Sequence, residues 1–291
     1  MSHIPVLLNE VMEILKPQKG ESFIDGTFGA GGHSEKILEA IGDSGKLISF
    51  DWDEKAQERN KNIFGRNNFL FIRGNYKNIK EILKEKSLSR VDGLLLDLGF
   101  SSDQLEYSGK GFSFKKDEPL VMSYGEGELT AADVVNSYSE EQLKEIIKTF
   151  GEEKYPGRIA RAIVEARHQA PIKTSFQLAQ IVRSVLPKGY ERGRIDPATR
   201  TFQAIRIFVN GELDNLQKVL RDLKDIVKSG GRVAIISFHS LEDRIVKNAF
   251  RDFKKEGIAE ILTKKPITAS LEEIKNNPRS RSAKLRGIKI I

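Results

Sequence analysis

The feature that most constrains the fold is a regular alternation of apolar runs and charged, helical runs between residues 22 and 97. Runs typical of β-strands cover residues 22–26, 46–51, 69–74 and 91–99. Helical patterns fill the gaps at residues 34–40, 53–64 and 77–87, the second with Asp53 as its expected N-cap. Strands that alternate with helices and end in a continuous apolar run are typical of parallel sheets with right-handed crossovers. The sequence therefore predicts an α/β fold.

The alternation stops after about residue 100 and gives way to a polar loop followed by a series of helices. Helical patterns cover residues 139–150, 157–169 and 175–186, and one long helix is expected over residues 201–228. A strand at 230–239, a helix at 241–253 and an antiparallel pair from 259–268 and 283–291 follow. We therefore expect a main domain of residues 1–106 and 197–291, and an inserted helical domain of residues 107–196.

Composition excludes several classes of protein. Apolar residues make up 39% and charged residues 31% of the 291 residues, and no apolar run has the length of a membrane span. Residues 1–20 have the spacing of an amphipathic helix rather than of a signal peptide, so a cytoplasmic protein is expected. The absence of cysteine excludes disulfides, thiolate zinc sites, iron–sulfur clusters and a thiol nucleophile. The four histidines lie far apart, so no metal site is predicted.

The net charge of +7 comes from two stretches of the chain. Between Lys154 and Arg206, 11 Lys and Arg residues stand against three acidic residues, a local excess of eight. Between Lys264 and Lys289, eight cations stand against two acids, an excess of six. Clustered positive charge indicates a polyanionic partner such as nucleic acid, although a surface rich in Lys and Glu is also typical of thermophilic proteins.

The stretch "DGTFGAGGHS", residues 25–34, lies in the first strand-to-helix turn, where doubly wound sheets bind nucleotides. Gly29, Gly31 and Gly32 allow positive φ angles and the close approach of a ligand to the backbone. The dinucleotide pattern GxGxxG is incomplete, because Ser34 stands at the position of its third glycine. The turn therefore favours a nucleoside without phosphates, such as S-adenosylmethionine, over NAD. Tight packing alone would also explain the glycines.

Polar residues follow the next three predicted strands. Asp51 ends the second strand, 22 residues after Gly29, where an acidic side chain typically binds ribose hydroxyls. Asn75 and Tyr76 follow the third strand, near the expected position of an adenine, although Tyr76 is equally compatible with the edge of the core. Asp97 ends the apolar fourth strand, where a carboxylate is costly to bury without a function.

Seven motifs spread over nearly the whole chain belong together: "PVLLNE" (5–10), "DGTFGAGGHS" (25–34), "LLLDLGFSSDQL" (94–105), "GFSF" (111–114), "PATRTFQAIRIFVNGEL" (197–213), "GGRVAIISFHSLEDRIVK" (230–247) and "NPRSRSAKLR" (277–286). In this combination they resemble the MraW family of methyltransferases. The resemblance implies a class I S-adenosylmethionine-dependent methyltransferase fold, Rossmann-like, with a mostly parallel sheet, an antiparallel C-terminal edge and an inserted helical domain for substrate recognition. It also implies methylation of the exocyclic N4 of a decoding-centre cytosine in bacterial 16S rRNA.

The resemblance implies cofactor contacts at Gly31, Gly32, His33, Asp51, Tyr76, Asp97 and Gln104. His33 and Gln104 follow from the resemblance alone, whereas strand positions also indicate the other five. The chain departs from the family pattern at Val121–Tyr124 and at Asp196, so the roles of these two loops stay open.

The absence of cysteine argues against C5 methylation of a pyrimidine, which normally needs a thiolate that adds to the ring. Direct displacement on the sulfonium methyl is the remaining chemistry, and it requires the nitrogen, methyl carbon and sulfur in line. The proton acceptor is unknown. Asp97 and His239 are candidates, although a structural, hydrogen-bonded histidine is the favoured interpretation of His239. Phe100 is a candidate for lining the base pocket, with a core position as the alternative.

The expected partner is 16S rRNA, free or in the assembled small subunit. Candidate RNA contacts are Arg158, Arg161, Arg167, Arg192, Arg194, Arg200, Arg279, Arg281, Lys284 and Arg286. No membrane partner is expected, and a homodimer is compatible with the sequence, which does not determine the oligomeric state. Two other functions remain open at this stage, an NAD-linked oxidoreductase and a noncatalytic RNA-binding factor with a vestigial nucleotide fold.

Overall fold

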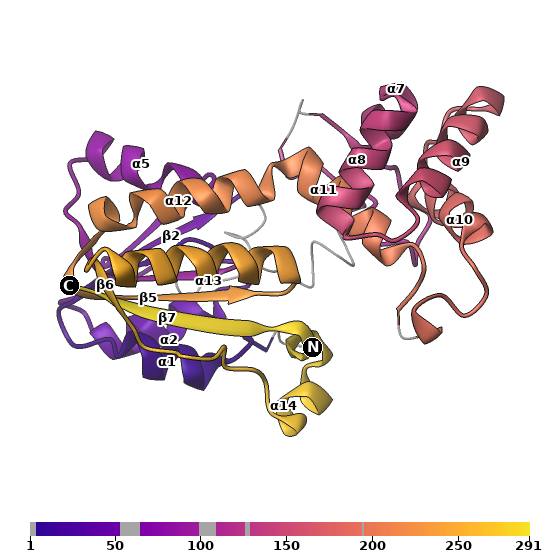
Figure 1. Cartoon of the computed structure of the whole chain (residues 1–291). Coiled ribbons are helices and arrows are strands. Elements are labelled where there is room, and N and C mark those ends of the chain that lie inside the picture. Colours follow the sequence, from indigo (N-terminus) through magenta and orange to yellow (C-terminus); the bar gives the residue numbers. More distant parts are fainter. Residues whose placement is uncertain (1–3, 53–64, 99–108, 126–128, 194) are drawn as a thin grey trace. The chain divides into compact units, whose positions relative to one another are not determined.

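A computed structural model describes residues 4–52, 65–98, 109–125, 129–193 and 195–291. The chain divides into two compact units, one of residues 1–99 and 213–291 and the other of residues 100–212 (Figure 1). The helix expected at 53–64, with Asp53 as its cap, lies outside the described residues, as do Phe100, Gln104 and Arg194.

The first unit is built on a sheet of seven strands. They are β1 (Ser22–Asp25), β2 (Lys46–Asp51), β3 (Phe69–Arg73), β4 (Val91–Asp97), β5 (Val227–Ser237), β6 (Ala259–Ile261) and β7 (Lys284–Ile290). Their order is β3-β2-β1-β4-β5-β7-β6. The first five strands are parallel, and β7 is antiparallel to both β5 and β6. This topology matches the fold that the motif resemblance implies, and the predicted α/β sheet with an antiparallel C-terminal edge is confirmed.

Helices lie on both faces of this sheet. The described helices of the first unit are α1 (Leu8–Leu15), α2 (Gly32–Ile41), η1 (Tyr76–Asn78), α5 (Ile79–Glu85), α12 (Glu212–Ile226), α13 (Ser240–Lys255), α14 (Leu271–Asn276) and η3 (Pro278–Ser282). Figure 1 shows α5, α12 and α13 on one side of the sheet and α1 and α2 on the other.

Alternation along β4 explains why both faces are apolar. Leu94 and Leu96 pack into the core beneath α5, α12 and α13, whereas Leu95 packs into the core beneath α1 and α2. All three side chains are buried. A continuous apolar run is therefore the pattern of a central strand covered on both faces.

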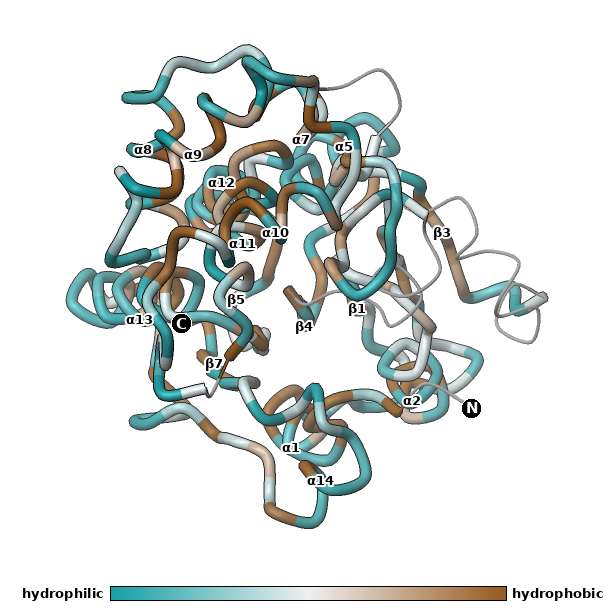
Figure 2. Tube along the Cα trace, turned by 90° about the vertical axis from the view of Figure 1, so that its right-hand side faces the viewer, coloured by the Kyte–Doolittle hydropathy of each residue, from teal (hydrophilic) through white to brown (hydrophobic). Residues whose placement is uncertain are grey.

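The second unit is helical. Its elements are α7 (Ala131–Ser137), α8 (Glu140–Gly151), α9 (Pro156–Gln169), α10 (Ser175–Val185), η2 (Tyr190–Gly193) and α11 (Thr199–Asn210). Capping boxes begin three of these helices, at Thr130, Ser139 and Thr174. Figure 2 shows brown and teal residues alternating along α8 and α9, the pattern of helices that bury one face. The three helices expected at 139–186 are confirmed.

The single long helix expected over residues 201–228 is wrong. Two helices occupy this stretch, α11 and α12, and Gly211 separates them with a φ of +58°. A left-handed residue ends an α-helix, and glycine adopts this conformation without steric cost. The apolar periodicity continues across Gly211, which is why the sequence pattern predicts one helix. The strand expected at 230–239 also begins earlier, at Val227.

In the described part of the chain, every helix is too short or too polar to span a bilayer.

We expect Gly93→Ala to destabilise the first unit. A Cβ at this position would lie 2.1 Å from Cε1 of Phe23, a buried ring on the neighbouring strand β1. Overpacking of this kind costs about 1–3 kcal/mol. Urea-induced unfolding measures the loss, with Gly65→Ala as the control because no atom lies within 4 Å of its added Cβ. Equal unfolding midpoints for the two variants would contradict the packing described.

Candidate functional site

The glycine-rich turn connects β1 to α2 at the carboxyl edge of the sheet. Gly29 and Gly31 have φ angles of +54° and +79°, and Gly31 is the N-cap of α2. These two positions therefore require glycine for the backbone conformation itself. Gly32 is different, because its added Cβ would lie 2.3 Å from Cγ of Pro5. The close approach at Gly32 is thus made by the N-terminal segment, a contact that the sequence did not reveal.

A buried hydrogen-bond network supports the turn from below. The hydroxyl of Ser34 donates to Oδ2 of Asp25 over 2.7 Å and lies 2.9 Å from the hydroxyl of Ser49. Oδ1 of Asp25 accepts from the backbone N–H of Thr27 over 3.0 Å. Burial raises the pKa of Asp25, and the hydrogen bonds from Ser34 and Thr27 oppose that rise. Ser34, which replaces the third fingerprint glycine, therefore ties α2 to β1.

Asp51 lies at the carboxyl end of β2, as predicted, and it also supports the turn. Its Oδ2 accepts the backbone N–H of Gly29 over 2.7 Å, and the residue is buried. The predicted role of Asp51 in binding ribose stays a prediction, while its contact with Gly29 explains part of its position. The chain's single tryptophan, Trp52, follows it directly.

Asp97, the last residue of β4, faces His33 in the first turn of α2. Nδ1 of His33 lies 3.9 Å from Oδ2 of Asp97, while Nε2 lies 3.0 Å from the carbonyl oxygen of Val6. Because a carbonyl only accepts hydrogen bonds, Nε2 carries the proton and Nδ1 is an acceptor in the neutral ring. Burial lowers the pKa of His33, and the charge of Asp97 opposes this. Thr27 completes the group, since its hydroxyl oxygen accepts the N–H of Asp97 over 2.6 Å.

Tyr76 lies beside the same edge of the sheet. A Cβ on Gly26, at the end of β1, would lie 3.1 Å from Cβ of Tyr76. Asn75 precedes it and caps η1, with its Oδ1 accepting the N–H of Lys77 over 2.9 Å. The ends of β1, β2, β3 and β4 therefore bring the glycine turn, Asp51, Tyr76 and Asp97 to one edge. Parallel strands explain this, because their carboxyl ends share an edge.

Comparison with known proteins identifies the family. The model of the MraW methylase family matches residues 1–291. This chain belongs to the MraW methylase family. It is 48% identical to the ribosomal RNA small subunit methyltransferase H of Persephonella marina over 296 residues, covering 100% of both chains. It is 47% identical to the protein of the same name from Syntrophotalea carbinolica, over 99% of this chain and 97% of that protein.

Among solved structures, the chain is similar to an rRNA methylase from Streptococcus thermophilus. The TM-score is 0.44 at 9% sequence identity, over 98% of this chain and 93% of that chain. The strand order described above, rather than this likeness, establishes the fold of this MraW-family chain.

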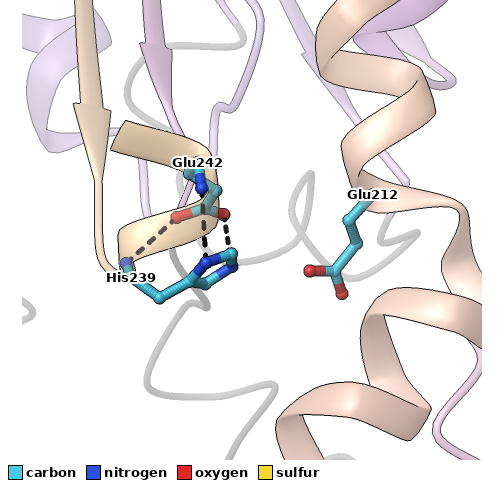
Figure 3. Close-up of side chains that lie close together, drawn as sticks. All are labelled: Glu212, His239 and Glu242. Carbon is cyan, nitrogen blue, oxygen red and sulfur yellow. Dashed lines mark hydrogen bonds and ion pairs between the residues drawn. The ribbon is translucent and has the colours of Figure 1, made fainter. Parts of the chain in front are cut away.

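His239 is the N-cap of α13 in this MraW-family chain (Figure 3). Its Nδ1 accepts the backbone N–H of Glu242 over 3.4 Å, and Nε2 lies 3.2 Å from Oε1 of Glu242. The Glu242 carboxylate in turn accepts the N–H of Phe238 over 2.9 Å. These contacts match the structural alternative considered for His239. A role in proton transfer stays a prediction.

Several candidate RNA contacts are engaged within the protein. Arg200 donates to the carbonyls of Gly151 and Glu152 at the end of α8, each over 3.3 Å. Lys284 and Arg286 both contact Asp243, over 3.4 Å and 2.7 Å. Arg167 likewise donates to the carbonyl oxygens of residues 135 and 138.

Four of the remaining described candidates are exposed: Arg158, Arg161, Arg192 and Arg281. Arg279 is half-buried, and its two terminal guanidinium nitrogens are buried. Arg158 lies over the ring of Tyr155 at 5.3 Å, and Arg161 lies 3.6 Å from a carboxylate oxygen of Glu140. All of these RNA contacts stay predictions.

The two loops that depart from the family pattern, at Val121–Tyr124 and at Asp196, make contacts inside the helical unit. Asp196 accepts two hydrogen bonds from Arg183, over 3.1 and 2.7 Å, and one from the N–H of Ala198. Tyr124 stacks on Phe112 with ring centroids 5.3 Å apart. Asn210 bonds both the N–H of Tyr124 and the carbonyl of residue 122. Both loops are therefore bound to neighbouring elements of the unit.

We expect Ser34→Ala to destabilise the chain by about 1–3 kcal/mol, because it leaves Oδ2 of the buried Asp25 carboxylate without its hydrogen-bond donor. Thermal unfolding measures the loss. Ser44→Ala is the control, because Ser44 is exposed. Equal stability of the two variants would show that the network beneath the turn is unimportant.

The lowered pKa of His33 predicts a pH dependence of stability. The unfolded state, with a pKa near 6.5, takes up a proton that the folded state resists. Stability contributed by neutral His33 is therefore present above pH 6.5 and is lost as the pH falls toward the lower folded pKa. His33→Gln keeps a donor for Val6 and removes the titration. Its urea midpoint should fall less on acidification than that of the wild type, and parallel pH profiles would contradict this.

Proposed function

We propose that this chain transfers a methyl group from S-adenosylmethionine to N4 of a cytosine in the decoding centre of small-subunit rRNA. The full-length family match carries the proposal, together with relatives at 48% and 47% identity that are named ribosomal RNA small subunit methyltransferase H. The cytosine and its N4 atom follow from the motif resemblance. The acceptor is bacterial 16S rRNA, free or in the assembled subunit.

The residues at the carboxyl edge of the sheet fit the cofactor. Nδ1 of His33 and Oδ2 of Asp97 are acceptors 3.9 Å apart, an arrangement that a cationic donor such as the cofactor's α-ammonium group stabilises. The turn at Gly29 and Gly31 presents backbone to the amino-acid part. Asp51 is the candidate for the ribose hydroxyls and Tyr76 for the adenine. Gln104, outside the described residues, belongs to the same proposed set.

When bound, the cofactor supplies a methyl group activated by its sulfonium charge. The chain's own part is to hold the target nitrogen in line with that methyl group, since its lone pair is delocalised into the pyrimidine ring. Positioning of this kind is worth roughly 7–11 kcal/mol. Asp97 is the first candidate to accept or orient the amine proton, because it lies at the end of β4 beside the glycine turn.

The helical insertion and the C-terminal basic stretch are the two proposed RNA-binding regions. The excess of eight positive charges between Lys154 and Arg206 lies mostly in the second unit's helices. Exposed Arg192 and Arg281 are the best candidates for phosphate contacts, because the structure gives Arg200, Lys284 and Arg286 partners within the protein.

Two other functions receive less support. An NAD-linked oxidoreductase would place a pyrophosphate on a complete glycine fingerprint, and Ser34 breaks that fingerprint with a side chain bonded to Asp25. A noncatalytic RNA-binding factor would have no need for the half-buried carboxylate of Asp97 beside buried His33. Isothermal titration with S-adenosylmethionine and NAD in parallel tests the first alternative.

Methyl transfer tests the proposal and the second alternative. We expect purified chain to transfer labelled methyl from S-adenosylmethionine to small subunits from cells that lack this protein. Mass spectrometry should locate the methyl group on N4 of a cytosine. Asp97→Ala should lower the rate about 100-fold or more, whereas Asp92→Ala, at the opposite end of β4, should not. An unmodified substrate, or methyl on another atom, overturns the corresponding part of the proposal.

Salt dependence tests the two RNA-binding regions. We expect the double variant Arg192→Gln/Arg281→Gln to bind small-subunit rRNA more weakly and to reduce the slope of log K against log salt by about 1–2. Arg200→Gln should instead lower the melting temperature, because it removes bonds to the end of α8. An unchanged slope in the double variant would place the phosphate contacts elsewhere.

A further inference from the structure

The N-terminal segment of residues 4–7 lies between the glycine turn and the C-terminal helix α14. On the turn side, Pro5 packs against Gly32, and the carbonyl of Val6 accepts the Nε2 proton of His33 over 3.0 Å. On the other side, the N–H of Leu7 donates to Oε1 of Glu273 over 2.8 Å. The carbonyl of Ile4 accepts from Nδ2 of Asn277 over 3.0 Å. Residues more than 260 positions apart thus meet across one short segment.

The segment ends in a backbone conformation that needs support. Leu7 has a φ of +53°, in the left-handed region that a branched side chain disfavours, and its side chain is fully buried. Leu7 is also the N-cap of α1 and has no side-chain cap of its own. The Glu273 carboxylate binds the backbone N–H of this residue, and such charge-assisted bonds are stronger than neutral ones.

Hydrogen bonds at the two ends of α14 fix the positions of Glu273 and Asn277 for these contacts. The hydroxyl of Ser270 accepts the N–H of Glu273 over 3.1 Å, and the N–H of Asn277 donates to the carbonyl of Glu273 over 2.6 Å. Glu273 and Asn277 are therefore presented together to the backbone of residues 4–7. Asn277 is buried, and Glu273 is half-buried.

The position of Val6 determines which nitrogen of His33 carries the proton. Because the carbonyl of Val6 accepts a hydrogen bond from Nε2, the proton of the neutral ring is on Nε2 and the unprotonated Nδ1 faces Asp97. If the segment moves away, His33 loses the acceptor that selects this tautomer and the contact that orients its ring. The effect would reach the proposed cofactor site without any change in a residue that contacts the cofactor.

We propose that Glu273 and Asn277 are positioning residues for the cofactor site. They hold Leu7 and Ile4 by their backbones, keep Pro5 and Val6 against the glycine turn, and thereby maintain the His33 tautomer that faces Asp97. This inference rests on the proposed function, in which S-adenosylmethionine binds at that turn.

The test compares Glu273→Ala, Glu273→Gln and the control Glu272→Ala in the full-length chain. Glu272 is the exposed neighbour of Glu273 on α14. Because Trp52 is the single tryptophan and follows Asp51, its fluorescence reports titration with S-adenosylmethionine. We expect Kd to rise about tenfold in Glu273→Ala and to stay within about threefold of the wild type in Glu273→Gln, whose amide oxygen still accepts the Leu7 N–H. The Kd of Glu272→Ala should not change.

A double-mutant cycle with His33→Ala, which removes the donor to Val6, separates positioning from a general loss of stability. If Glu273 acts through His33, the effect of Glu273→Ala on Kd should shrink to about threefold or less in the His33→Ala background. In turnover, Glu273→Ala should raise KM for S-adenosylmethionine and leave KM for the RNA unchanged. Should Glu273→Ala fail to fold, Asn277→Asp provides the same cycle, since it replaces the donor to Ile4 with an acceptor.

The outcomes separate the two proposals. If the wild type does not bind S-adenosylmethionine, the proposed function fails. If the wild type binds but Glu273→Ala binds equally well, or if the effects of Glu273→Ala and His33→Ala are additive, the positioning role is overturned while the proposed function stands.

Discussion

The glycine turn between β1 and α2 depends on two carboxylates that bind it from different strands. Asp25 ends β1 and accepts from Thr27 and Ser34, and Asp51 ends β2 and accepts from the N–H of Gly29. Backbone with positive φ at Gly29 and Gly31 has few intrinsic restraints, so these acceptors determine its shape. The position of α2, of His33 at its start, and of Asp97 opposite His33 follows from this arrangement.

The same group of residues holds the turn in a single conformation, as the proposed cofactor site requires. Gly26 is packed against Leu96 and Tyr76, and Gly32 against Pro5, so the turn has packed neighbours on both sides. Thr27 links the turn to the end of β4 through the N–H of Asp97. A site supported in this way loses little freedom when a ligand binds, which favours affinity.

Several of the basic residues that make the chain cationic are engaged within the protein rather than exposed for a partner. Net charge predicts a polyanionic partner, yet Arg167, Arg200, Lys284 and Arg286 bind carbonyl or carboxylate oxygens inside their own units. Arginine suits both tasks, because its guanidinium group bridges helix ends and carboxylates as readily as it contacts phosphate. The charge of a stretch therefore indicates the class of partner, while the contacts of each side chain indicate which residues remain accessible to it.

By itself the sequence determined the α/β class, the antiparallel C-terminal edge, the helices of the insertion and the strand-end positions of Asp51, Tyr76 and Asp97. These features depend on local periodicity and on the rule that parallel strands end at one edge. Only the tertiary structure decided that Ser34 bonds Asp25, that Pro5 lies against Gly32, and that Glu273 binds Leu7. It also decided the break at Gly211, where apolar periodicity continues across a left-handed residue. Local patterns report which neighbours share a face, whereas contacts between residues 4–7 and 273–277 exist because the folded sheet brings the two ends of the chain together.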